Sequence, residues 1–171
     1  MKLVLVAGIF VPVLVATALV FSKPAVMRTT ATVWADEGGR CSLATVAGNY
    51  GFTLTGTLIL PTGGVGVAGA GLATITSEGN FSGTESRSVG GGTAQETLGG
   101  TITVNSDCTG TLTAPVFESG ELVRTSVFSV VFDDNSKELR AIQTSLVLPN
   151  GTSVPNVITV EGRKIGPAKG E

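Results

Sequence analysis

Residues 48–60, GNYGFTLTGTLIL, alternate large apolar side chains with small or polar ones over most of the segment. The apolar face holds Tyr50, Phe52, Leu54, Leu58 and Leu60, and the other face holds Gly51, Thr53, Thr55 and Thr57. A period of two is the geometry of a half-buried β-strand. Most of the following chain repeats this pattern, which predicts that the strand begins a single antiparallel barrel.

Seven further segments with strand-like composition follow, separated by short turn sequences such as Glu78-Gly79-Asn80. The predicted strands cover residues 48–60, 65–77, 81–89, 96–105, 108–117, 122–132, 137–148 and 154–165. No segment has the apolar period of a helix, and charged residues make up only 14% of the chain. We therefore expect an all-β protein with one antiparallel, up-and-down, eight-stranded barrel, and a β-sandwich is the alternative.

The N-terminus carries the pattern of an export signal. Met1-Lys2 precedes an uncharged apolar run over residues 3–21, and small residues at Val33-Trp34-Ala35 offer a cleavage site before Asp36. We expect residues 1–35 to be a signal peptide and residues 36–171 to be the barrel domain of a secreted or periplasmic protein. The alternative is an uncleaved membrane anchor, because the apolar run is almost long enough to span a bilayer.

The two cysteines, Cys41 and Cys108, are expected to form one disulfide if the protein is exported, and two buried thiols are the alternative. A disulfide that closes a loop of this length adds roughly 4 kcal/mol to the free energy of unfolding. Alternate turns of an up-and-down barrel lie at opposite ends, so Cys41 before the first strand and Cys108 in a later turn should meet at one end. The Gly-rich connections collect at the other end, which we expect to be open.

Several kinds of chemistry are excluded or disfavoured. The chain has no histidine, which rules out a Ser-His-Asp or Cys-His catalyst and removes the commonest metal ligand. The sequence contains no basic patch, which argues against nucleic acid as a partner. The string Gly64–Gly69, with Glu85 downstream, matches a dinucleotide fingerprint, but a strand follows where a helix is needed. The acidic turn at residues 133–136 lacks the spacing of a calcium loop. We predict no cofactor, no metal and no catalytic residue.

Candidate binding residues lie on the strands over 122–132 and 137–148. With the hairpin turning at residues 134–135, Ser126 faces Gln143, and Arg124, Ser126 and Gln143 share the apolar face near the open end. Inward polar groups at a barrel mouth can orient a ligand, and Arg124 can pair with a carboxylate. Two alternatives remain: a one-residue register difference turns all three outward, or Arg124 pairs with a neighbouring acid. Tyr50, near the disulfide end, is expected to close the barrel floor.

Short motifs along the chain resemble those of a group of small exported bacterial β-barrel proteins without assigned function. The motifs are Cys41-Ser42-Leu43, Gly48-Asn49-Tyr50-Gly51-Phe52, Glu78-Gly79-Asn80 with Gly83, Asp107-Cys108-Thr109-Gly110-Thr111 and Leu139-Arg140-Ala141-Ile142-Gln143-Thr144. Gly48-Asn49-Tyr50 also resembles the G-x-W start of lipocalin-type barrels, with Tyr in place of Trp. The resemblance implies a secreted barrel and brings no activity or catalytic residue with it.

These observations favour an exported, non-catalytic barrel that binds a small apolar or amphipathic ligand. A structural or surface-interaction protein with a filled barrel is the second hypothesis, and a histidine-free enzyme of the cyclase or isomerase kind is the third. The expected partner is a small lipophilic molecule. Membrane contact is expected only through the N-terminal segment, if it stays uncleaved. The sequence makes no prediction of oligomeric state.

Overall fold

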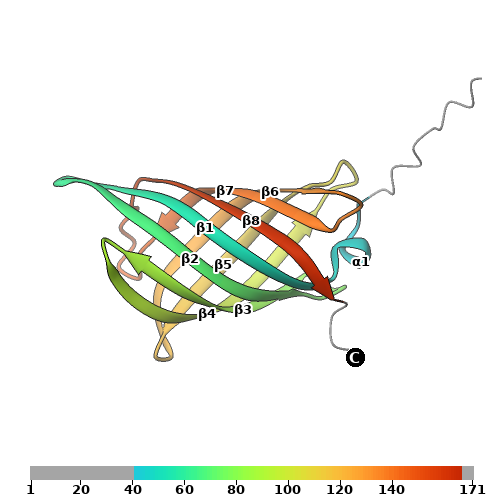
Figure 1. Cartoon of the computed structure of the whole chain (residues 1–171), viewed down its shortest axis with the longest axis horizontal. Helices are drawn as coiled ribbons and strands as arrows, with labels where there is room; N and C mark the ends of the chain where they lie inside the picture. Colours follow the sequence, from blue (N-terminus) through green and yellow to red (C-terminus); the bar gives the residue numbers. More distant parts are fainter. Residues whose placement is uncertain (1–40, 167–171) are drawn as a thin grey trace, which may run out of the picture. The chain divides into compact units, whose positions relative to one another are not determined.

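The structure is a computed structural model that describes residues 41–166. Eight antiparallel strands follow one another in chain order and close into a barrel, with β1 hydrogen-bonded to both β2 and β8 (Figure 1). The elements are α1 (Leu43–Val46), β1 (Gly48–Leu60), β2 (Gly63–Ile75), β3 (Asn80–Val89), β4 (Gly92–Val104), β5 (Thr109–Glu118), β6 (Glu121–Asp133), β7 (Glu138–Val147) and β8 (Asn156–Gly166). The predicted up-and-down barrel is confirmed. The expected signal peptide or anchor at residues 1–35 lies outside the described residues.

The alternation in β1 places Tyr50 and Leu54 inside the barrel, where both are buried, whereas Leu60 at the end of the strand is exposed. β2 pairs with β1 along its whole length and contains the glycine string of residues 64–69. Gly71, on the same strand, stands beside Phe52: a Cβ there would meet the Phe52 ring at 2.7 Å and the Thr84 carbonyl oxygen at 2.2 Å. At this position glycine makes room for the neighbouring strand and for the ring.

One end of the barrel, which we call the floor, is closed by α1 and the disulfide. Cys41 and Cys108 are bonded, with their Cα atoms 4.9 Å apart, so the predicted disulfide is confirmed. The short helix α1 was not predicted, because four residues are too few to show a helical period. Ser42 caps it, and Ser42 and Thr45 form a capping box. α1 lies beside the start of β1 and the end of β8 (Figure 1).

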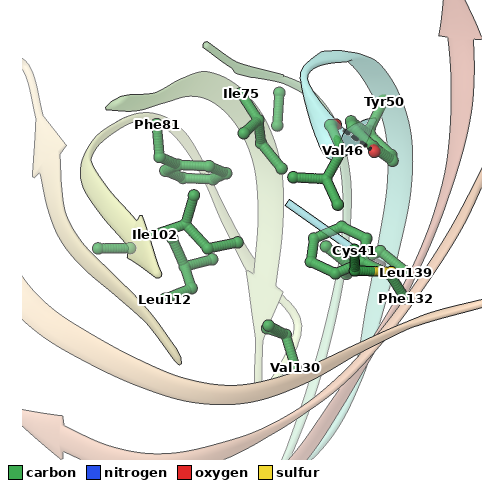
Figure 2. Packing of buried hydrophobic residues seen from close by; sticks show 12 residues of the cluster. Cys41, Val46, Tyr50, Ile75, Phe81, Ile102, Leu112, Val130, Phe132 and Leu139 are labelled. Carbon is green, nitrogen blue, oxygen red and sulfur yellow. Dashed lines mark hydrogen bonds between the residues drawn. The ribbon is translucent and has the colours of Figure 1, made fainter. Parts of the chain in front are cut away.

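The apolar core is densest at the floor. Figure 2 shows Val46, from α1, packed among side chains of the surrounding strands, including Tyr50, Ile75 and Phe132. The Tyr50 hydroxyl donates to the carbonyl oxygen of Val46 at 2.6 Å and lies 3.2 Å from that of Ser136. Tyr50 therefore closes the floor, as predicted. No helix within residues 41–166 is long and apolar enough to cross a membrane.

The β6–β7 hairpin has a different register from the predicted one. Phe128 pairs with Gln143 rather than with Ala141, and Ser126 pairs with Leu146. The turn spans residues 134–137, and Asp134, Asn135 and Ser136 all have positive φ, so its centre falls one residue later than predicted. Moving the centre by one residue shifts the pairing by two. Each side chain therefore keeps its face, because faces alternate with a period of two.

Most of the predicted strand bounds agree with the structure to within two residues, and the largest difference is in β4. This strand begins at Gly92 rather than at residue 96, because only Gly90 and Gly91 form the turn after β3. Both have positive φ, at 58° and 92°. The longer β4 brings Glu96 well inside the strand, opposite Glu85 of β3.

Candidate ligand-binding site

The barrel encloses a cavity of about 70 Å³, mostly lined by apolar side chains of the surrounding strands. Five polar or charged side chains also line it: Glu85, Arg87, Arg124, Ser126 and Gln143. The structure thus places all three predicted binding residues inward and at one cavity. The predicted alternative in which a register difference turns them outward does not occur.

Four charged residues form a group that we call the interior ion cluster. They are Glu85 and Arg87 of β3, Glu96 of β4 and Arg124 of β6, and each exposes only 3–7% of its surface. All four lie in the strand halves next to the loop end, which is the end opposite the floor. Charged side chains are rarely buried unless they are paired, so this cluster is the least ordinary feature of the interior.

Arg124 holds both acids of the cluster. Its Nη1 and Nη2 donate to the two carboxylate oxygens of Glu96, each at 2.6 Å, and Nη2 also donates to Glu85 at 2.9 Å. The two-pronged contact with Glu96 is the strongest geometry for an arginine–carboxylate pair. The second alternative left open by the sequence, that Arg124 pairs with a neighbouring acid, is the arrangement in the structure.

The two acids differ in protonation. Burial raises the pKa of Glu85 to about 7, and its hydrogen bond with Glu96 acts in the same direction, against the charge of Arg124. Burial also acts to raise the pKa of Glu96, but hydrogen bonds from Arg124 and Glu85 outweigh it and leave this pKa below its ordinary value. Near neutral pH, Glu96 is therefore anionic, and Glu85 is close to the midpoint of its titration.

Arg87 is the unpaired cation of the cluster. It forms no ion pair with any acid among residues 41–166, and its buried Nε has no hydrogen-bond partner in that part of the chain. Its pKa is lowered, first by burial and then by the positive charge of Arg124. A buried hydrogen-bond donor without a partner lowers the stability of the fold, so an acceptor placed at this Nε would be stabilising.

Ser126 and Gln143 form a smaller polar pair at the same cavity. Gln143 Nε2 donates to Ser126 Oγ at 2.9 Å and to the carbonyl oxygen of Ser145 at 3.1 Å. The pair spans the bulge between Val127 and Phe128, where Phe128 pairs with Gln143 and Ser126 pairs with Leu146. These contacts fix the side chain of Gln143, on β7, at the wall of the cavity.

Sequence reasoning missed Arg87 and Glu96, and it noted Glu85 only for its distance from the glycine string. One signal was present: Glu85 and Arg87 share the face of Phe81, which is buried. Charged residues on the apolar face of a strand indicate an interior polar site. Within residues 41–166, no three metal-ligating side chains come together.

No family model and no curated protein matches this chain. A solved structure described as "Structure of EF1p2_mFAP2b bound to DFHBI" is similar with a TM-score of 0.46 and 10% sequence identity, over 72% of this chain and 96% of that chain. A similarity at this level carries no argument about function. The fold and the interior define the class on their own: a closed eight-stranded antiparallel barrel with a disulfide-bonded floor and a charged interior cavity.

The pKa of Glu85 predicts that the barrel is more stable in mild acid than in mild base. A folded-state pKa of about 7, above the ordinary 4.5, gives stability that is complete below about pH 4.5 and is lost as the pH rises through about 7. We expect the free energy of unfolding in urea to be about 2 kcal/mol higher at about pH 5 than at about pH 8. Glu96 acts in the opposite sense, but only at lower pH.

The Glu85→Gln variant is the control for this pH dependence. It keeps the size and the hydrogen-bonding edge of the side chain and removes the titration. Its free energy of unfolding should differ little between the two pH values. The same pH profile in the variant and the wild type would assign the dependence to other groups.

Proposed function

We propose that this chain is an exported barrel that binds a small amphipathic molecule in its interior. The observation that carries the proposal is the pairing of an apolar cavity with a buried, unpaired Arg87 and the oriented Ser126–Gln143 pair. Binding sites combine an apolar lining with a few placed polar groups in this way. The apolar walls would hold the body of the ligand, and the polar groups would orient its head.

The interior ion cluster supports a function beyond filling the barrel. Replacing a buried ion network by apolar side chains of similar volume is often neutral or stabilising. A barrel that only had to be filled would gain nothing from four buried charges. Clustered buried ionisable groups in a cavity are instead typical of functional sites.

The volume of the cavity limits the ligand. A buried water needs at least about 10–15 Å³ of such volume, and pockets for drug-sized ligands measure about 300–1,000 Å³. A cavity of about 70 Å³ therefore suits a molecule of only a few heavy atoms. The same small volume is what favours the alternative of a structural barrel filled by its own side chains.

Export is supported by the disulfide, since disulfides persist mainly in oxidising compartments outside the cytosol. The sequence of residues 1–35 and the lipocalin-like start of β1, at Gly48-Asn49-Tyr50, agree with a secreted or periplasmic barrel. Cleavage near Ala35 would release it, and an uncleaved segment would anchor it to a membrane.

An enzyme is the second candidate, and one observation favours it. Glu85 lines the cavity and has a pKa of about 7, which is the range in which a carboxylic acid exchanges protons efficiently at neutral pH. A histidine-free acid–base catalyst would need such a group. Turnover of a bound ligand would distinguish this candidate from a binding protein.

A thermal-shift screen with small amphipathic molecules tests the proposed function. A ligand at one hundred times its Kd stabilises the folded state by about 2.7 kcal/mol, which raises Tm by several degrees. Gln143→Leu should weaken the shift, because it removes the polar edge that faces the cavity. Ser129→Ala, on the exposed face of β6, should leave the shift unchanged. Equal loss in both variants would mean that the ligand does not bind inside.

A further inference from the structure

We propose that Arg87 is an anion subsite, and that the ligand is a short-chain monocarboxylate whose carboxylate docks on the free edge of its guanidinium. This inference rests on the proposed function, and it names the chemical class of ligand and the residue that recognises it. It also reassigns the role expected of Arg124. That arginine is occupied by two acids, so the cation left for a ligand is its neighbour on β3.

The first step of the argument is the unmet hydrogen bonding of Arg87. The side chain is 7% exposed and lines the cavity, yet its Nε has no acceptor among the described residues. A guanidinium presents its donors in a fixed fork that matches a carboxylate. A carboxylate in the cavity would satisfy the buried donor and neutralise the buried charge together.

The second step is the charge of the interior ion cluster. Two arginines face Glu96, which is anionic, and Glu85, whose carboxyl group shares a hydrogen bond with Glu96. With Glu85 protonated, the two positive charges are opposed by one negative charge. The interior then carries one uncompensated positive charge, and in a buried cavity this favours a monoanion over a neutral or cationic ligand.

The third step is the space around Arg87. Across the two ladders of β3, its partners are Gly69 on β2 and Ala94 on β4, the smallest residues that a strand can offer. Beyond Gly69 in the same row lie Leu54 of β1 and then Val160 of β8. The Leu54 side chain packs over Gly69, where an added Cβ would meet its Cγ at 3.2 Å, so an apolar chain attached to an anion at Arg87 would meet aliphatic side chains.

The fourth step is size. The cavity volume corresponds to roughly five to seven minimal water sites, so a ligand of about six heavy atoms is the best match. Butanoate has this size, and butanamide is the same shape without the charge. The pair therefore separates recognition of the anion from simple filling of the cavity.

Titration of the disulfide-bonded protein with butanoate and with butanamide, followed by NMR at about pH 6, tests the proposal. Charge-assisted hydrogen bonds in a buried site give a preference for the acid of about tenfold or more. The Arg87 Nε–Hε resonance should move on saturation with butanoate and stay in place with butanamide. Octanoate, which exceeds the cavity, should bind more weakly than butanoate.

Arg87→Met should abolish the preference for the acid, and Arg140→Met, which changes an exposed arginine on the outer wall, should retain it. The wild-type comparison stands even if Arg87→Met is unstable. Equal affinities with an unmoved Arg87 resonance would overturn the anion subsite and leave the proposed binding function intact. Absence of binding by both compounds would overturn this ligand class, and a clean native mass with no thermal shift from any small amphipath would overturn the proposed function as well.

Discussion

Arg124→Ala is expected to lower the free energy of unfolding by about 3–5 kcal/mol, because it leaves the Glu96 carboxylate buried without its partner. Arg140→Ala is the matched control. Arg140 also contacts two acids, Asp133 at 3.3 Å and Glu138 at 3.5 Å, but 66% of its side chain is exposed. Exposed pairs are worth at most about 1 kcal/mol, so this variant should change stability little. Urea unfolding followed by far-UV circular dichroism measures the stability of both variants.

A combined variant separates the cost of an unpaired charge from the cost of lost packing. Arg124→Met and Arg87→Met together with Glu85→Gln and Glu96→Gln remove all four charges of the cluster and keep most of the side-chain volume. We expect this variant to recover most of the stability lost in Arg124→Ala, since the penalty comes from the charges left behind. A combined loss as large as that of Arg124→Ala would show that the cluster itself stabilises the fold.

Removal of the disulfide is the second large effect. The bond joins residues that are 67 positions apart, and the loop-entropy relation gives about 4 kcal/mol for a closure of this length. Cys41→Ala with Cys108→Ala should therefore lower the free energy of unfolding by about 2–4 kcal/mol. The loss arises in the unfolded state, so the barrel of the variant should keep its native circular dichroism spectrum at low temperature.

Two controls accompany the disulfide variant. Intact mass should rise by two hydrogen atoms when the wild-type protein is reduced, and alkylation without reductant should label neither cysteine. The single variant Ser42→Ala removes only the cap of α1, next to Cys41, and should cost about 1 kcal/mol. A disulfide variant no less stable than Ser42→Ala would contradict the importance of the bond for the floor.

The barrel was predictable because its signals are local. The alternation from Tyr50 to Leu60 fixes the faces of β1, and turn residues such as Gly79 and Gly120 divide the chain into strands. The pairing of Cys41 with Cys108 followed from the order of the turns once a barrel was assumed. The faces of β6 and β7 were also correct, although the positive φ values at residues 134–136 moved the register by two.

The interior ion cluster was not predictable in the same way, because it depends on contacts across the barrel. Arg124 of β6 reaches Glu85 and Glu96, which are 39 and 28 residues earlier in the chain. No sequence pattern near Arg124 indicates that these two glutamates are its partners. Once the barrel closes, Glu96 meets Arg124 and neither is left for a ligand. The free cation is then Arg87, a residue that sequence reasoning missed.

Native mass spectrometry of the protein purified from its own host's envelope or medium tests the central claim most directly. If the barrel is a binding protein, the native mass should exceed the mass of the disulfide-bonded chain by a reproducible small-molecule increment, which is lost on denaturation and in Gln143→Leu but kept in Ser129→Ala. An increment lost in Arg87→Met as well would locate the head of the ligand at the anion subsite. A native mass equal to that of the chain alone, with no thermal shift from any small amphipath, would contradict the claim and favour a barrel filled by its own side chains.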